Sequence, residues 1–264
     1  MESMIQTLAR ELGQKEQYVE NVVKLLDDGN TVPFISRYRK EMHGTMDDQT
    51  IRRLADRLAY LRGLEERRTE VQHAIESQGK LTAELAAAIA AAQTLAALDD
   101  LYRPYRPKRR TRASIAREKG LEPLAAAITA ARNTSPVLEA LAKPYIHPEK
   151  GVETAEAALA GAGDIIAEDL SDDAALRGRL RALLHRTGVL RTAGTDENDT
   201  VYTMYHDFAE PVRRLQSHRV LAVNRGEKEG KLKVTLDADE SEAVAAVTRT
   251  LLHPQNPYGD FLRA

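Results

Sequence analysis

The sequence contains no cysteine and no tryptophan, and aromatic residues make up only 5% of its 264 residues. Without cysteine the chain can form no disulfide and can use no thiolate nucleophile, which suits a cytoplasmic protein. Because aromatic side chains are scarce, alanine and leucine must fill the core. This composition favours closely packed helices over a β-sandwich.

Long apolar runs are also missing. No stretch approaches the ~18 residues that a membrane-spanning helix needs. The start of the chain, Met1-Glu2-Ser3-Met4, lacks the basic-then-apolar pattern of a signal peptide. We therefore expect a cytoplasmic protein that has no membrane partner.

Sequence signatures of catalysis are absent as well. There is no glycine-rich phosphate loop and no dinucleotide fingerprint. The seven histidines are too scattered to form a metal-spaced pair, and the acidic stretch Thr195–Thr200 lacks the pattern of a calcium-binding loop. We predict that the protein is not an enzyme and that it needs no cofactor and no metal.

What the sequence does contain is a succession of helical patterns. Asp47–Gln78 repeats apolar residues at nearly the helical period, and after Gly79 an alanine-rich helix, capped by Thr82, is predicted to run back as its antiparallel partner. His218–Asn224 and Lys231–Asp237 are apolar and β-branched and predict one small β-hairpin. The predicted fold class is mainly α, multi-helical with helix-turn-helix-like elements, one long antiparallel helix pair and this hairpin near the C-terminal end.

Changes in composition suggest three segments. Residues 1–46 form a helical, helix-turn-helix-like segment, and residues 47–200 form a central helical region that contains a basic stretch at 101–120. Residues 201–264 hold a helix and the hairpin, and they lead into a truncated linker, because the chain ends where Pro257 could begin another element.

The N-terminal segment has the spacing of a helix-turn-helix. Ala9, Gly13 and Val19 supply the small residue, the turn glycine and the buried β-branched residue of that motif. Its second helix mixes acidic and basic residues, whereas a helix that reads DNA is rich in Arg, Asn and Gln. A plain helical hairpin is therefore the favoured interpretation.

Residues Thr31–Asp48 combine Pro33 and the apolar Phe34-Ile35 with cations. The cations are Arg37, Arg39 and Lys40. Nothing in this stretch forms a catalytic arrangement. We interpret it as a tight connection between helices whose charges are paired.

The densest charge lies in the basic segment, Arg103–Arg112, where six of ten residues are Arg or Lys. Pro104 and Pro107 are expected to hold it extended, and guanidinium groups bind phosphate in bidentate fashion. The helix that follows would present N-terminal amides to an anion, and nearby tyrosines could stack on bases. The candidate nucleic-acid contacts are Arg103, Arg106, Lys108, Arg109, Arg110, Arg112, Tyr102 and Tyr105.

A second explanation of the basic segment stays open at this point. The cations could pair with carboxylates of the same chain, either Asp99-Asp100 or the acidic stretch Asp164–Asp173. An exposed ion pair contributes only ~0–1 kcal/mol, so stability alone is a weak reason to gather six cations.

Three stretches together resemble one family. Thr31–Asp48, Leu101–Ala125 and Ser217–Val234 are similar to the N-terminal region of the bacterial Tex proteins, which are called transcription accessory proteins. The resemblance implies a cytoplasmic, largely helical protein that binds nucleic acid and supports transcription, and whose core is shared with a eukaryotic transcription elongation factor. It also implies that a full-length member continues into a nuclease-like domain, helix-hairpin-helix modules and an OB-fold RNA-binding domain, so that this chain is an N-terminal fragment.

The resemblance supplies no catalytic residue for this region. We therefore predict a non-catalytic module that binds RNA or DNA, or supports that binding, mainly through phosphate contacts. The alternative is a helical scaffold that docks other domains of its own full-length chain, or proteins of the transcription machinery, without binding nucleic acid itself.

Overall fold

The computed structural model describes residues 3–107, 109–133, 135–196 and 201–263. Lys108 and residues 197–200 of the acidic stretch lie outside the described residues. The described chain is mainly helical with one small antiparallel sheet, so the predicted class is confirmed as mainly α but is not all-α. Contacts divide the chain into two compact units, Met1–Tyr102 and Arg103–Ala264, each with its own hydrophobic core.

The three-segment division expected from composition stays a prediction. No helix among the described residues is both long and apolar enough to cross a lipid bilayer.

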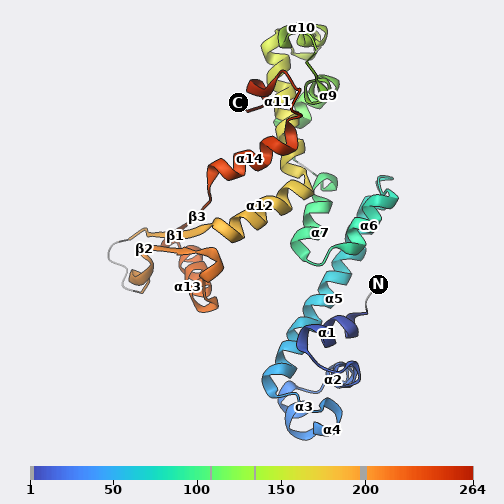
Figure 1. Cartoon of the computed structure of the whole chain (residues 1–264), viewed down its shortest axis with the longest axis vertical. Helices are drawn as coiled ribbons and strands as arrows, with labels where there is room; N and C mark the ends of the chain where they lie inside the picture. The colour runs from blue at the N-terminus through green and yellow to red at the C-terminus, as the bar shows by residue number, and fades with distance from the viewer. Residues whose placement is uncertain (1–2, 108, 134, 197–200, 264) are drawn as a thin grey trace. The chain divides into compact units, whose positions relative to one another are not determined.

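One long helix, α5, organises the first unit. α1, α2 and α3 pack against its N-terminal half, and α6 and α7 contact it farther along the chain (Figure 1). Leu8, Ile35 and Ile51 are fully buried in the core between them. The helices of this unit are α1 (Met4–Leu12), α2 (Glu16–Asp27), α3 (Val32–Tyr38), α4 (Lys40–His43), α5 (Asp48–Glu76), α6 (Ala83–Ala91) and α7 (Leu95–Tyr102).

The helix-turn-helix spacing is confirmed by α1 and α2. The Ser3 hydroxyl accepts the Gln6 amide at 3.1 Å and the Gln6 side chain accepts the Ser3 amide at 2.9 Å, which closes a capping box at the start of α1. Gly13 ends the helix with φ of 63°, a conformation that glycine adopts without strain. Ala9 and Val19 are buried on either side of this turn.

The antiparallel partner of α5 is present, but it ends at Ala91, whereas the alanine-rich pattern predicts a helix to about Leu98. The Arg68 guanidinium donates to the carbonyl oxygens of Ile89 and Ala92, and the Tyr60 hydroxyl accepts the Leu95 amide. From Ile89 in α6 to Leu95 at the start of α7, the contacted residues of α5 go back from Arg68 to Tyr60, so this part of the chain runs opposite to α5. The partner ends at Ala91 because Thr94 caps a new helix, α7, by accepting the Ala97 amide at 3.1 Å.

The core of the second unit is built around α11. Residues of α8, α9 and α10 and the C-terminal Tyr258 and Phe261 pack against it. Asn256 donates to the Ile128 carbonyl at 2.9 Å, which ties the C-terminal segment to α9. The α-helices of this unit are α8 (Arg112–Glu118), α9 (Glu122–Ala130), α10 (Leu138–Ala142), α11 (Ala155–Asp172), α12 (Ala174–Thr187), α13 (Ser217–Lys228), α14 (Glu240–Leu251) and α15 (Gly259–Arg263).

The sheet in the second unit differs from the predicted hairpin. Its order is β2-β1-β3, in which β1 (Val189–Gly194) pairs antiparallel with both β2 (Asp207–Pro211) and β3 (Leu232–Asp237). The predicted strand His218–Asn224 is wrong, because this segment belongs to α13.

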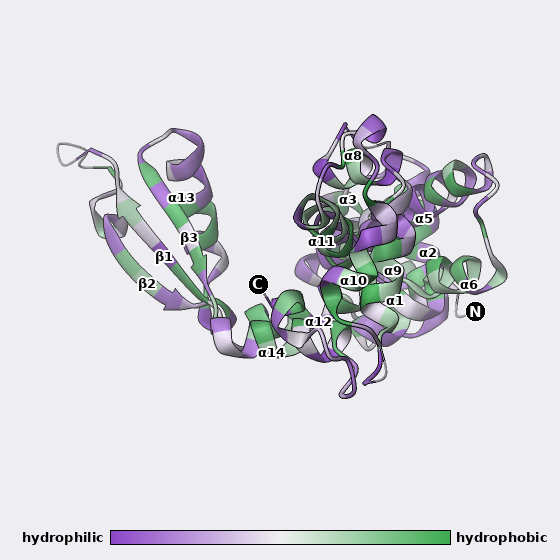
Figure 2. Cartoon of the chain, turned by 90° about the horizontal axis from the view of Figure 1, so that it is seen from above, coloured by the Kyte–Doolittle hydropathy of each residue, from purple (hydrophilic) through white to green (hydrophobic). Residues whose placement is uncertain are grey.

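The physical reason for the difference is packing. α13 lies along the sheet (Figure 2), where Val223 and Gly226 are buried and Leu232 and Tyr202 fill the space beside Gly226. A short apolar run fits a helix as well as a strand, so the choice depended on neighbours that are distant in sequence.

Candidate nucleic-acid interface

The basic segment connects a short turn to a capped helix. Arg103–Tyr105 form a 3-10 turn, so the expectation that the prolines hold the whole segment extended is wrong for these residues. The described residues between Arg106 and Thr111 have no regular secondary structure, and α8 begins at Arg112.

The cap of α8 leaves less room for an anion than the sequence suggested. Thr111 and Ser114 exchange hydroxyl and amide hydrogen bonds of 2.9 and 3.0 Å. One N-terminal amide of α8, that of Ser114, is therefore already satisfied by the chain itself.

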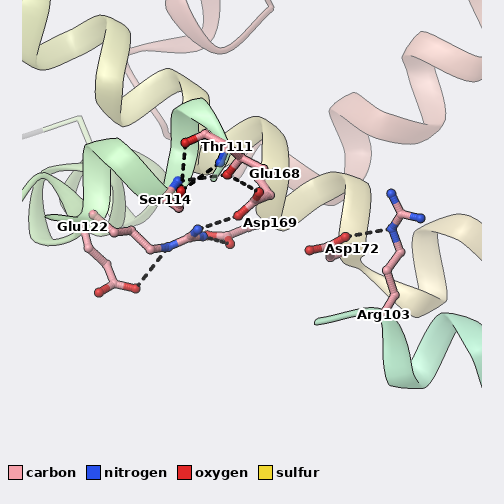
Figure 3. A network of polar contacts seen from close by, with 8 residues as sticks. Arg103, Thr111, Ser114, Glu122, Glu168, Asp169 and Asp172 are labelled. Carbon is pink, nitrogen blue, oxygen red and sulfur yellow. Dashed lines mark hydrogen bonds and ion pairs between the residues drawn. The ribbon is translucent and has the colours of Figure 1, made fainter. Parts of the chain in front are cut away.

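Two polar contacts fix the ends of the basic segment on α11 (Figure 3). Arg103 donates from Nε to Asp172 Oδ1 at 2.8 Å, and the Asp172 side chain is only 9% exposed. Thr111 donates its hydroxyl to Glu168 Oε1 at 2.9 Å. The segment therefore spans two points on one helix, which restricts how its other cations can be arranged.

Arg117, which lies outside the basic segment and the candidate contacts predicted from the sequence, reinforces the second of these points. Its guanidinium donates to Glu168 at 2.5 Å and to Asp169 at 2.6 Å, and it lies 3.7 Å from Glu122. Burial lowers the pKa of Arg117, but the hydrogen bond to Glu168 and the neighbouring carboxylates outweigh it, and the pKa is raised overall. The available signal was the acidic Asp164–Asp173 stretch, whose members recur at helical spacing.

The remaining described cations of the basic segment are exposed. Arg110 pairs with Glu118 at 3.0 Å and Arg112 with Asp164 at 3.4 Å, and the Arg112 side chain is 87% exposed. Arg109 forms no ion pair with any residue that the structure describes. Since exposed pairs of this kind contribute only ~0–1 kcal/mol, a phosphate group can replace the carboxylates at little energetic cost.

The pairing that the sequence left open is therefore present in part. Arg103 and Arg112 pair with the acidic stretch, as one of the two explanations supposed. Arg106 and Arg109 are exposed, as phosphate binding requires, although Arg106 also has a partner within the chain.

The two tyrosines are less available than the cations. Tyr102 and Tyr105 are half-buried. The Arg67 guanidinium carbon lies 5.5 Å from the centroid of the Tyr102 ring, so a cation already occupies one position over that ring. A base would have to compete for it.

The two N-terminal stretches differ in how their charges are arranged. On α2, Glu20 and Lys24 pair at 3.1 Å, which fits the mixed-charge surface that the sequence indicated. On α3 and α4 the expected pairing is present only for Arg39, which lies 4.0 Å from Glu41, and is wrong for Arg37 and Lys40, which form no ion pair with a described residue.

Comparisons with known proteins agree on one family. The family model described as the Tex-like protein N-terminal domain matches residues 2–76, and the one described as Tex central region-like matches residues 133–255. The basic segment lies between these two matches.

Individual relatives cover nearly the whole chain. Protein tex of Bordetella pertussis is 49% identical over 241 residues, which are 89% of this chain and 30% of the relative. Transcriptional accessory protein Tex of Neisseria gonorrhoeae is 46% identical over 232 residues, 87% of this chain and 30% of the relative. The human S1 RNA-binding domain-containing protein 1 is 27% identical over 248 residues, 90% of this chain and 24% of the relative. The chain thus spans about a third or less of the length of these curated relatives.

Proposed function

This chain belongs to the Tex family and carries its N-terminal and central regions, and from that premise we propose that it is a non-catalytic module that binds nucleic acid through the basic segment in support of transcription. The names of its relatives support the proposal. One is called a transcriptional accessory protein, which agrees with a role in transcription, and another an S1 RNA-binding domain-containing protein, which agrees with nucleic-acid binding.

The observation that carries the proposal is the arrangement of the basic segment. Arg103 and Thr111 hold it on α11, while Arg109, Arg110 and Arg112 are exposed between and beside these contacts. A fixed backbone with exposed guanidinium groups loses little conformational freedom when phosphates bind.

The expected contacts are to phosphate rather than to bases. The exposed arginines do not lie on one helix that could enter a groove, because the described residues between Arg106 and Thr111 are irregular. Binding should therefore depend weakly on sequence and strongly on salt, as counterions are released from the nucleic acid.

The second candidate function is a protein-docking scaffold. It is favoured by the ion pairs that Arg103, Arg110 and Arg112 already form with carboxylates of this chain. An acidic surface of another domain or protein could then replace those carboxylates in the same way.

The test is fluorescence anisotropy with labelled single-stranded RNA, single-stranded DNA and duplex DNA at about 50 and 200 mM salt. The variant Arg109→Ala/Arg110→Ala/Arg112→Ala should weaken binding about 10- to 100-fold, and the slope of log K against log salt should fall by roughly 2 to 3. Thermal stability should hardly change, because the lost pairs are exposed.

The matched control is Arg213→Ala/Arg214→Ala/Arg225→Ala, which removes the same charge from other exposed positions. Equal weakening by both variants would mean that net charge alone attracts the nucleic acid. No binding by the unmodified chain at either salt concentration would leave the docking scaffold as the function.

A further inference from the structure

A second basic surface, rich in aromatic rings, lies on the first unit. We call it the α3–α4 patch, and it consists of Phe34, Arg37, Tyr38, Arg39 and Lys40. All five side chains are exposed, with Tyr38 at 66% and Phe34 at 37%. The chain has only nine Tyr and three Phe and no Trp, so two rings side by side in water are unusual for it.

The local sequence places both rings on one face. Phe34 and Tyr38 are four residues apart on α3, and their ring centroids lie 5.4 Å from each other. Ile35, which lies between them in the sequence, is fully buried in the core of the unit and fixes α3 against α5. The rings are therefore held outward by the packing of their neighbour.

The cations of the α3–α4 patch are poorly neutralised. Arg37 and Lys40 form no ion pair with any described residue, and Arg39 reaches only Glu41, at 4.0 Å. The Arg39 guanidinium carbon instead lies 5.6 Å from the Phe34 ring centroid, a distance at which cation and ring attract. Two more carboxylates follow in the sequence, of which Asp48 accepts hydrogen bonds from Ser36 and Arg52 and Asp47 accepts one from the Thr50 amide.

We propose that the α3–α4 patch is a separate binding site for single-stranded nucleic acid. Tyr38 stacks on an unpaired base, and Arg37 and Lys40 contact the phosphates on either side of it. Rings combined with a basic surface are the usual construction of single-strand sites, because every base has a face that can stack. In a duplex the bases already stack on one another, so Tyr38 could reach none of them.

Tyr38 is the better of the two rings for this role. Its side chain is the more exposed, and Arg39 lies over the Phe34 ring rather than over Tyr38. The site belongs to the unit Met1–Tyr102, whereas the basic segment belongs to the other unit, so neither proposal depends on the other.

The absence of tryptophan provides a direct test. The variant Tyr38→Trp places the only tryptophan of the chain at the site, and stacking on a base should quench its fluorescence when an oligothymidylate of about 12 nucleotides is added. The control is Val137→Trp, at a position of similar exposure, 69%, in the other unit, which should not be quenched.

Binding affinity provides a test that is independent of the fluorescence quenching. In anisotropy titrations with the same oligonucleotide, Tyr38→Ala should weaken binding about 5- to 150-fold, whereas Tyr38→Phe, which keeps the ring, should bind like the unmodified chain. Repeating the quenching in the Arg109→Ala/Arg110→Ala/Arg112→Ala background separates the two sites, since the signal should persist even if the basic segment binds nothing.

Three results would overturn this proposal. Quenching that is absent, or equal at Val137→Trp, would show that no base stacks at Tyr38. Equal quenching by duplex DNA would exclude a single-strand site. Quenching by polyglutamate but not by oligothymidylate would identify the α3–α4 patch as a docking surface for an acidic protein segment.

Discussion

Gly161 lies where α11 packs closely against its neighbours in the second unit. A Cβ atom there would come within 2.4 Å of Leu121 Cδ1 and 3.3 Å of Ala116 Cβ, and both residues are buried. The glycine therefore permits close packing of α11 against the segment Ala116–Leu121 rather than a break in the helix. α11 runs without interruption from Ala155 to Asp172.

The first prediction follows from that contact. Gly161→Ala should destabilise the protein by about 1–2 kcal/mol, because the overlap with buried Leu121 outweighs the ~0.5–1 kcal/mol that alanine ordinarily adds in a helix. Gly178→Ala on α12, where a Cβ meets nothing within 4 Å, should stabilise by about 0.5–1 kcal/mol. Urea unfolding of both variants measures whether each free energy of unfolding falls or rises. A stabilising Gly161→Ala would contradict the packing argument.

A second residue-scale prediction concerns pH. Arg57 donates to both oxygens of Glu11, at 2.7 and 2.8 Å, and these bonds hold the pKa of Glu11 below its usual value of 4.5. A carboxyl with a lowered pKa in the folded state stabilises above its usual pKa and loses this contribution as the pH falls through the lowered one.

Glu11→Gln should therefore cost about 0.5–1 kcal/mol near pH 7, a value kept small because both side chains are about a third exposed. The difference from the unmodified chain should shrink as the pH is lowered below 4.5. Denaturant unfolding of both proteins near pH 7 and below pH 4.5 measures this difference in the free energy of unfolding. Glu66→Gln, which removes the same charge where no ion pair with a described residue is present, is the control, and a difference that grows in acid would refute the assignment.

At the scale of elements, α11 is the support of the basic segment. Its Glu168 accepts from Thr111 and its Asp172 accepts from Arg103 (Figure 3). Arg117 donates to both Glu168 and Asp169. The acidic stretch thus holds the side chains of Arg103, Thr111 and Arg117, and the described arginines between these residues stay exposed.

The third prediction tests that support. Arg117→Met should destabilise the second unit by about 1–2 kcal/mol, because Glu168, only 14% exposed, loses a charged donor. It should also weaken nucleic-acid binding, since the basic segment is less firmly placed. Arg110→Met, whose pair with Glu118 is exposed on both sides, should leave stability nearly unchanged. Equal stability of the two variants in thermal unfolding would argue against a supporting role for Arg117.

At the scale of the whole molecule, each compact unit has a core of its own. Ile51 is fully buried in the first and Ile165 is 1% exposed in the second. Truncating either to alanine should cost about 2–5 kcal/mol in the unit that contains it. We expect calorimetry to resolve two transitions, with Ile51→Ala shifting one and Ile165→Ala the other. If each variant shifted every transition equally, the chain would unfold as one cooperative body.

Much of this architecture could be predicted from local signals. Ser3, Asp47 and Thr82 accept backbone amides at the starts of α1, α5 and α6, and Gly13 adopts a positive φ at the end of α1. The apolar period of α5 marks the face on which Ile51, Leu54 and Leu58 are buried. Caps, turns and helical period act within a few residues, so the sequence by itself determined these helices, the mainly α class and the resemblance to the Tex family.

Tertiary structure decided the features that depend on distant partners. Residues Ser217–Lys228 became a helix because β1 pairs with β2 and β3, which left α13 to cover the sheet. Carboxylates more than 50 residues away in the sequence hold Arg103 and Thr111, and they leave Arg109 exposed. Burial of Ile35 turned the Phe34 and Tyr38 rings outward. Sequence can place a charge or a ring in a segment, but which groups stay available to a ligand depends on what the folded chain brings beside them.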